Sequence, residues 1–140
     1  MEDIYWLQML KYQQEFHHLS RALLSQSQKQ TLTTSERELL ARLYIKPDEI
    51  TPLALSRSSG MKKESVSRCL KSLFEKGYIA KEKHPRDERS YTLHLTEIGQ
   101  NELRQNYMAI LQPFYDLRRK MGPEFDTLFQ LIVKTNENIK

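Results

Sequence analysis

The segment that decides the fold is TPLALSRSSGMKKESVSRCLKSLFEKG, residues 51–77. It predicts a short helix that begins at Thr51-Pro52, because a threonine hydroxyl at the N-cap accepts a hydrogen bond from the first turn and proline at the first helical position has no N–H to leave unpaired. Ser59-Gly60 ends this helix, since glycine adopts a positive φ at low cost. A second helix is expected from about Lys63 to Lys76, where Gly77 ends it.

One face of the second helix is apolar at helical spacing. Its members are Val66, Cys69, Leu70 and Leu73. Because each residue of a helix advances by about 100°, these four side chains share one side and fix which face is buried. Two helices joined by a short glycine turn are typical of a helix-turn-helix.

Residues 78–95 follow with the alternation of a β-hairpin. Tyr91, Leu93 and Leu95 occupy every second position, and the turn is expected at residues 84–89. The predicted fold class is mainly α with a small β-hairpin wing: a winged helix-turn-helix flanked by N- and C-terminal dimerisation helices. Such an arrangement is one by which proteins read double-stranded DNA.

The chain of 140 residues carries 22 Lys and Arg against 18 Asp and Glu, a net charge of +4. Residues 51–96 hold ten of the basic and five of the acidic residues. Such a localised excess favours a polyanion-binding surface. A single cysteine excludes an intramolecular disulfide. With no leader segment and no apolar run of about 20 residues, the sequence predicts a cytoplasmic protein without a membrane partner.

Long amphipathic helices are predicted at both ends of the chain. The first, residues 4–26, has apolar side chains spaced alternately by four and three: Tyr5, Met9, Tyr12, Phe16, Leu19 and Leu23. The second begins after a Thr96 N-cap and runs to about Met121 with the same spacing, in Leu103, Tyr107, Ile110, Phe114, Leu117 and Met121. Pro113 predicts a kink or break near residues 111–112. Such seams suit helices that pack lengthwise on other helices.

Two further helices complete the prediction. Thr33 and Glu36 form a capping-box pattern that opens a helix ending before Lys46-Pro47. Pro123 opens a last helix with Phe125, Leu128, Phe129 and Ile132 on one face.

The predicted domain organisation has three parts. They are an N-terminal dimerisation helix and loop (1–31), the winged helix-turn-helix (32–96) and the C-terminal dimerisation helices (97–140). A symmetric pair would present two recognition helices one DNA turn apart, ~34 to 36 Å, and match a pseudo-palindromic site.

Five motifs occur in order along the chain. They are Leu32-Thr33, Val66-Ser67-Arg68, LFEKGYI at residues 73–79, PRDER at residues 85–89 and LTEIG at residues 95–99. The Asp-x-Arg turn followed by LTxxG is fairly specific, and together the motifs resemble the MarR family of bacterial transcriptional regulators. The resemblance implies an obligate homodimer with intertwined terminal helices. It also implies a repressor that a small ligand or an oxidant releases, as many members are.

The outer face of the second helix and the hairpin supply the candidate DNA contacts: Lys62, Lys63, Ser65, Ser67, Arg68, Lys71, Lys83, Arg86 and Arg89. Arg68 is the leading candidate for a bidentate contact with guanine in the major groove, whereas the lysines are expected to meet phosphates. Arg89 is the candidate for insertion into a narrow minor groove. Charge and the family resemblance assign Asp87 to brace the wing by pairing with an arginine.

The candidate dimerisation residues are Tyr5, Met9, Tyr12, Phe114, Leu117, Phe125, Leu128 and Ile132. Three aromatic residues, Phe16, Tyr44 and Tyr107, lie where relatives hold aromatic acids, which makes them a candidate crevice for a small aromatic effector. Filling of the dimer core is the alternative explanation of these aromatics.

The sequence does not indicate catalysis, thiol chemistry or metal binding. Cys69 falls on the buried stripe, where a thiol is inert, and the adjacent His17 and His18 point about 100° apart and make a poor metal chelate. We therefore predict no enzyme, no metal and no cofactor. Two alternatives to a ligand-released repressor remain: a ligand-independent architectural or competing regulator of the same fold, and a winged-helix protein–protein adaptor.

Overall fold

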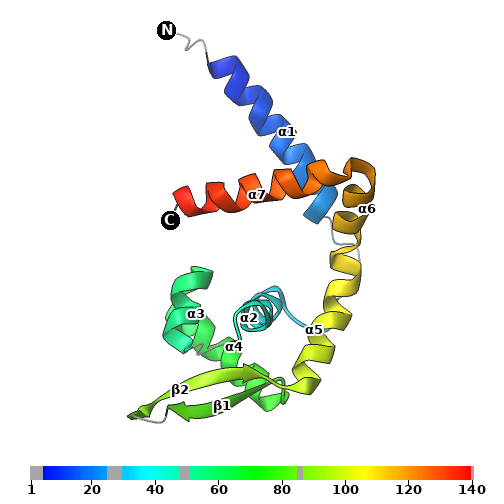
Figure 1. The fold of residues 1–140 in the computed structure, drawn as a ribbon. Coiled ribbons are helices and arrows are strands. Elements are labelled where there is room, and N and C mark those ends of the chain that lie inside the picture. Colours follow the sequence, from blue (N-terminus) through cyan, green and yellow to red (C-terminus); the bar gives the residue numbers. More distant parts are fainter. Residues whose placement is uncertain (1–4, 25–29, 48–50, 85–86, 140) are drawn as a thin grey trace. The chain divides into compact units, whose positions relative to one another are not determined.

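The computed structural model describes residues 5–24, 30–47, 51–84 and 87–139; for residues 84 and 87–90 it describes the backbone alone. The elements follow in the order α1 (Trp6–Leu24), α2 (Thr34–Ile45), α3 (Pro52–Ser59), α4 (Lys63–Glu75), β1 (Ile79–His84), β2 (Asp87–Leu95), α5 (Glu97–Ile110), α6 (Gln112–Met121) and α7 (Pro123–Asn138) (Figure 1). The fold is mainly α with one antiparallel hairpin, which confirms the predicted fold class. Among the described residues, no helix has the length and apolar character to span a membrane.

Contacts divide the chain into two compact units, residues 30–108 and residues 1–29 with 109–140. The first unit contains α2 to β2 and most of α5, and the second contains α1, α6 and α7. The sequence-based division placed all of residues 97–140 together. In the structure the contacts group α5 as far as Met108 with the winged helix, and the three-part division stays a prediction.

The helix-turn-helix has the local signals expected of it. The Thr51 hydroxyl accepts a hydrogen bond from the Ala54 N–H at 3.1 Å and Pro52 is the first residue of α3. Gly60 follows α3 with φ +72°, and Gly77 follows α4 with φ +78°. Lys62 precedes α4 without a side-chain cap. These features confirm the predicted boundaries of both helices.

The core of the unit 30–108 is built from leucines of several elements. Leu39, Leu40 and Leu43 of α2 are at most 1% exposed. They belong to one buried cluster with Leu55 of α3, Leu93 of β2, Leu103 of α5 and the four apolar side chains predicted for α4. The hydrophobic spacing of α4 therefore predicted its buried face correctly.

The strands of the hairpin extend further toward its turn than the sequence predicted. β1 and β2 pair antiparallel from Ile79 opposite Leu95 to His84 opposite Asp87, with an irregularity between Lys83 and His84. The prediction of a turn over residues 84–89 was wrong, since four of those six residues belong to strands. The polar residues and Pro85 of this segment are typical of a turn in the sequence, whereas the backbone pairing that defines a strand depends little on side-chain polarity.

The start of α5 is fastened to the end of α4. The Thr96 hydroxyl accepts a hydrogen bond from the Gly99 N–H at 3.0 Å and donates one to the Gly77 carbonyl at 2.6 Å. The Thr96 N–H donates to the Tyr78 carbonyl at 3.0 Å. The predicted Thr96 N-cap is therefore confirmed, and it also joins α5 to the turn after α4.

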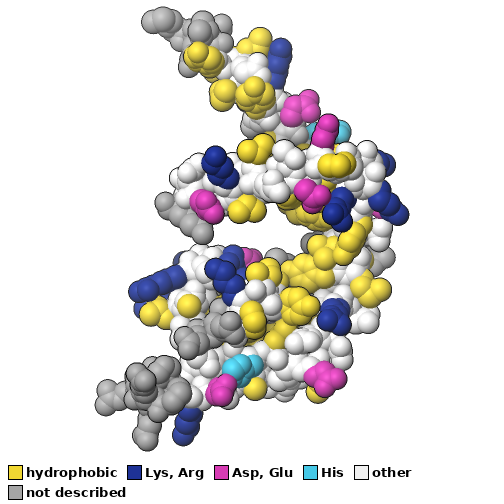
Figure 2. All heavy atoms as spheres, in the orientation of Figure 1, with side chains coloured by type: hydrophobic (Ala, Val, Ile, Leu, Met, Phe, Trp, Pro, Cys, Tyr) yellow, Lys and Arg dark blue, Asp and Glu magenta, His cyan; other side chains and the backbone are white. Residues whose placement is uncertain are grey.

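The helices α6 and α7 follow a break at Leu111, as Pro113 predicted. Phe129 of α7 contacts Phe114 and Phe125, with ring centroids 6.0 and 4.7 Å apart. Neither α6 nor α7 contains a buried residue, and in the described part of α1 Leu23 alone is buried. Figure 2 shows hydrophobic side chains lying uncovered on α1, where Trp6 and Tyr12 are 58% and 59% exposed.

Replacing Gly99 with alanine tests the junction of α5 with the end of α4. A methyl group at Gly99 would lie 2.1 Å from the Tyr78 carbonyl oxygen, a backbone atom that cannot easily move. Gly99→Ala should destabilise the protein by about 1–3 kcal/mol through overpacking, measured by urea denaturation. Asn101→Ala, at an exposed position of the same helix, is the control and should change stability by less than about 0.5 kcal/mol. Equal denaturation midpoints for Gly99→Ala and the wild type would contradict this close approach.

Candidate nucleic-acid interface

The outward face of α4 brings several predicted DNA contacts together. Ser67, Arg68 and Lys71 are exposed on this helix, opposite the buried stripe, and Ser65 is partly exposed beside them. Lys62 and Lys63 are exposed where the helix begins. We call the exposed residues Glu64, Ser67, Arg68, Lys71 and Glu75 the α4 outer face.

The basic side chains of this region are available to an external partner. Among the described residues, Arg68 and Lys71 form no ion pair, and neither do Lys62 and Lys63. The start of a helix also carries a partial positive charge from its unpaired N–H groups. An anion that reaches the first turns of α4 would therefore meet several uncompensated positive charges.

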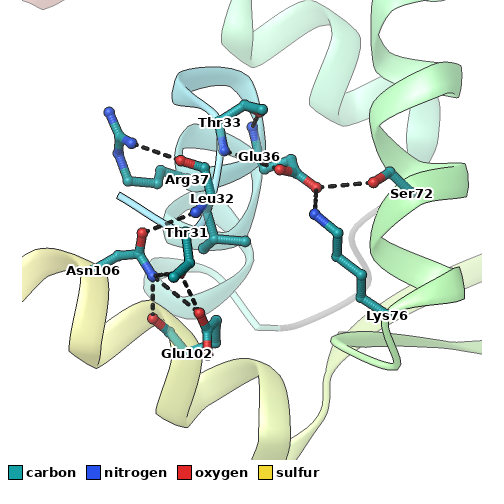
Figure 3. Close-up of polar contacts among 9 residues, drawn as sticks. All are labelled: Thr31, Leu32, Thr33, Glu36, Arg37, Ser72, Lys76, Glu102 and Asn106. Carbon is teal, nitrogen blue, oxygen red and sulfur yellow. Dashed lines mark hydrogen bonds and ion pairs between the residues drawn. The ribbon is translucent and has the colours of Figure 1, made fainter. Parts of the chain in front are cut away.

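The inner side of α4 is fastened to α2 by a buried carboxylate (Figure 3). Glu36 is 3% exposed, and its Oε2 accepts hydrogen bonds from Lys76 Nζ at 2.9 Å and Ser72 Oγ at 3.0 Å. Its Oε1 accepts from the Thr33 N–H at 2.9 Å, and the Glu36 N–H donates to the Thr33 hydroxyl at 3.1 Å, which confirms the predicted capping box. One side chain thus caps α2 and holds the C-terminal half of α4.

Burial alone would raise the pKa of the Glu36 carboxyl, but hydrogen bonds from the Thr33 N–H, Lys76 and Ser72 outweigh it and hold that pKa below its ordinary value. The hydrogen bond to Glu36 in turn raises the pKa of Lys76. Both groups are therefore charged around neutral pH, and their attraction favours the observed position of α4 on α2.

The N-terminal end of α2 is fastened to α5 by a second polar cluster (Figure 3). Asn106 is 2% exposed, and its Oδ1 accepts a hydrogen bond from the Leu32 N–H at 3.1 Å. Its Nδ2 donates to the Thr31 hydroxyl at 2.9 Å and to the Glu102 carbonyl at 2.8 Å. The Arg37 guanidinium donates to the Leu32 carbonyl at 2.9 Å. No motif of the sequence predicted this cluster, because Leu32 and Asn106 lie 74 positions apart.

The wing is attached to α4 by a cation–π arrangement. The Nζ of Lys81 lies 4.9 Å from the ring centre of Phe74 in α4 and 4.6 Å from that of Tyr91 in β2. Across the hairpin, His94 Nε2 and Glu82 Oε2 are 2.6 Å apart. The sequence contains an aromatic residue on each neighbouring element, but their spacing did not predict this role of Lys81.

The structure describes only some of the wing residues for which a role was predicted. Lys83 is exposed on β1. Arg86 lies outside the described residues, and the side chains of Asp87 and Arg89 do so as well. The proposed bracing by Asp87 and minor-groove contact by Arg89 stay predictions.

Cys69 is buried in the core cluster, and burial raises the pKa of its thiol to about 11. The thiol is therefore protonated around neutral pH and unreactive. Within the described ranges, no group of three or more His, Cys, Asp or Glu side chains has an arrangement that could hold a metal ion.

The predicted crevice and dimerisation residues are distributed over both units. Tyr44 is 47% exposed, and Tyr107 packs against the core, where burial raises the pKa of its hydroxyl. Phe16 belongs to α1 in the other unit, so the crevice stays a prediction. The predicted dimerisation residues differ in exposure. Those in and just before α1 are exposed: Tyr5, Met9 and Tyr12. Those of α6 and α7 are half-buried: Phe114, Leu117, Phe125, Leu128 and Ile132.

A helix-turn-helix with a hairpin packed at the end of its second helix defines the winged helix-turn-helix class. The model of the MarR family matches residues 32–91, which form most of this unit. Residues 32–91 thus form a MarR-family domain, which confirms the resemblance of the motifs. A search of the curated proteins finds no match.

Solved structures of similar fold cover almost the whole chain. The PcaV transcriptional regulator of Streptomyces coelicolor, in complex with its natural ligand, is 17% identical with a TM-score of 0.59, over 100% of this chain and 99% of that one. A mutant MarR from E. coli complexed with operator DNA is 17% identical with a TM-score of 0.61, over 96% and 98%. The S. aureus MepR–DNA complex is 16% identical with a TM-score of 0.55, over 98% of each chain. At these identities the likeness establishes the fold.

Replacing Glu36 with glutamine tests the fastening of α4 to α2. Because the folded pKa of Glu36 is lowered, its carboxylate contributes stability above its ordinary pKa of 4.5, and this contribution is lost as pH falls through the lower folded pKa. Glu36→Gln should cost about 1–3 kcal/mol at pH 7, by urea denaturation. The difference from wild type should narrow as the pH falls below 4.5.

The control is Glu38→Gln on the same helix. Glu38 pairs with Arg42 at a partly exposed site, 3.0 Å apart, and losing such a pair should change stability by less than about 1 kcal/mol. A Glu36→Gln penalty that stays constant down to pH 3 would show that the loss is one of packing and not of charge.

Proposed function

We propose that the protein is a transcriptional regulator that binds a specific double-stranded DNA site through the α4 outer face and the wing. The observation that carries this proposal is α4 itself: one face is fixed in the core, and the other presents Arg68 and Lys71 without ion-pair partners among the described residues. A helix of this kind fits the major groove of B-DNA, about 12 Å wide. Two of the similar structures are described as complexes with DNA, one of them with operator DNA.

We infer that it acts as a homodimer. A 16-residue helix such as α7 without a buried residue leaves its apolar face incompletely covered within one chain, and the same holds for most of α1 in the described range. A second copy would cover these faces and supply a second α4, which matches a pseudo-palindromic operator. The role we assign is repression, because a further solved relative of this fold, at 18% identity, is described as the Multiple Antibiotic Resistance Repressor.

We also propose that a small aromatic effector controls DNA binding. This proposal is supported by the PcaV structure, which is described as a complex with a natural ligand, and by the half-exposed Tyr44 of this chain. A ligand that binds one conformation of the dimer more tightly than the other would shift the population of DNA-competent molecules.

Replacing Arg68 with alanine tests base reading by α4. The wild type should enrich one sequence from a pool of randomised duplexes, and its affinity for that duplex should fall steeply as salt rises because phosphate contacts release counterions. Arg68→Ala should bind the selected duplex about 5- to 150-fold more weakly and lose its preference at one base pair. Fluorescence anisotropy at two salt concentrations measures both effects.

Arg104→Ala, at an exposed position of α5, is the matched control and should bind as the wild type does. An equal loss of affinity for every sequence would contradict base reading by Arg68. Affinity that does not change with salt would contradict an electrostatic interface altogether.

A further inference from the structure

The first turn of α4 contains an acid that a general phosphate-binding surface would not. Glu64 is exposed in the first turn of α4, within about 40° of Arg68 around the helix axis at 100° per residue. Lys62, Lys63 and Lys71 are its basic neighbours in the sequence. Among the described residues Glu64 forms no ion pair with any of them.

A carboxylate in this place is unfavourable unless it meets a hydrogen-bond donor. DNA phosphates repel it, and most atoms on the base edges of the major groove are acceptors: guanine offers N7 and O6, and thymine offers O4. The available donors are the amino groups on cytosine N4 and adenine N6. In a base pair the adenine amino group lies between two acceptors, its own N7 and the O4 of thymine, which both repel a carboxylate. The cytosine amino group has one acceptor beside it, the O6 of guanine, and a C–H group on its other side.

We propose that Glu64 determines specificity by accepting a hydrogen bond from the N4 amino group of a cytosine in the major groove. This inference rests on the proposed function, since it requires that α4 enter the groove. Glu64 lies one helical turn before Arg68, so its cytosine occupies a base pair near, but not identical with, the one read by Arg68. The carboxylate also disfavours thymine, guanine and adenine at that position.

The first turn of a helix is a favourable place for an acid on electrostatic grounds alone. An acid with only this role would alter the stability of α4 and leave base preference unchanged. A second possibility is that Glu64 acts by orienting Arg68, its neighbour at i+4. In that case removing either side chain would change preference at the same base pair. The readout that separates these roles is therefore base preference by position.

The experiment selects sequences from randomised duplexes with the full-length wild type, Glu64→Gln, Glu64→Ala and Arg68→Ala. The wild type should enrich cytosine at one position in each half-site. Glu64→Gln should move that preference to adenine, because an amide can pair with adenine N6 and N7 together. Glu64→Ala should lose the preference, about 5- to 150-fold in relative affinity, while binding unselected duplex at least as tightly as the wild type.

Glu97→Gln is the matched control, since Glu97 is an exposed acid in the first turn of another helix, α5, and its replacement makes the same change of charge. It should keep the wild-type preference at every position. Circular dichroism melting of each variant checks folding, and Glu64→Gln preserves the shape of the side chain.

Three results would overturn the inference while leaving the proposed function standing. The first is that both Glu64 variants keep the base preferences of the wild type. The second is that the wild type selects a site without a preferred cytosine. The third is that the Glu64 variants change preference at the same base pair as Arg68→Ala does. A wild type that enriches no sequence would overturn the proposed function itself, which the wild-type selection alone reveals.

Discussion

Burial of the apolar stripe of α4 is the constraint on which the rest of the unit depends. Val66 and Leu73 are 2% and 0% exposed, so the rotation of the helix about its axis is fixed by the core. A rotation by a single residue, about 100°, would bring charged side chains toward the leucines of α2 and carry the α4 outer face away from solvent. The buried stripe of α4 therefore determines which of its residues are exposed and can contact DNA.

Polar contacts then fix the relative positions of the helices and the wing, which burial of apolar side chains alone does not determine. Apolar packing is non-directional, whereas Glu36 sets the position of α4 on α2 through two hydrogen bonds to its carboxylate, from Ser72 and Lys76. Asn106 does the same between the start of α2 and α5. Lys81, lying over two aromatic rings, joins the wing to the end of α4. These contacts hold α4 and the wing in one preorganised surface. Such a surface loses less conformational entropy on binding.

Features set by neighbouring residues could be predicted from the sequence. The Thr51 and Thr33 caps, the stripe of α4 and the break caused by Pro113 all depend on residues a few positions apart. Contacts between distant residues could not: Glu36 and Lys76 are 40 positions apart, and Leu32 and Asn106 are 74 apart. For the candidate site, the spacing of apolar residues predicted the exposed face of α4. It did not predict the contacts of Glu36 and Asn106 on the inner side, which depend on tertiary packing. Nor did it predict the strand ends of the hairpin, which depend on backbone pairing.

The most direct test of this account is an amide chemical-shift map of the protein titrated with its selected duplex. We expect the largest changes at Lys81 and Lys83 of the wing and at the exposed residues at the start and on the outer face of α4, which are Lys62, Lys63, Glu64, Ser67, Arg68 and Lys71. The buried Val66, Cys69, Leu70 and Leu73 and residues 123–138 of α7 should change little. Changes concentrated away from α4, or none on addition of duplex, would contradict the claim that the outward face of this helix is the surface that reads DNA.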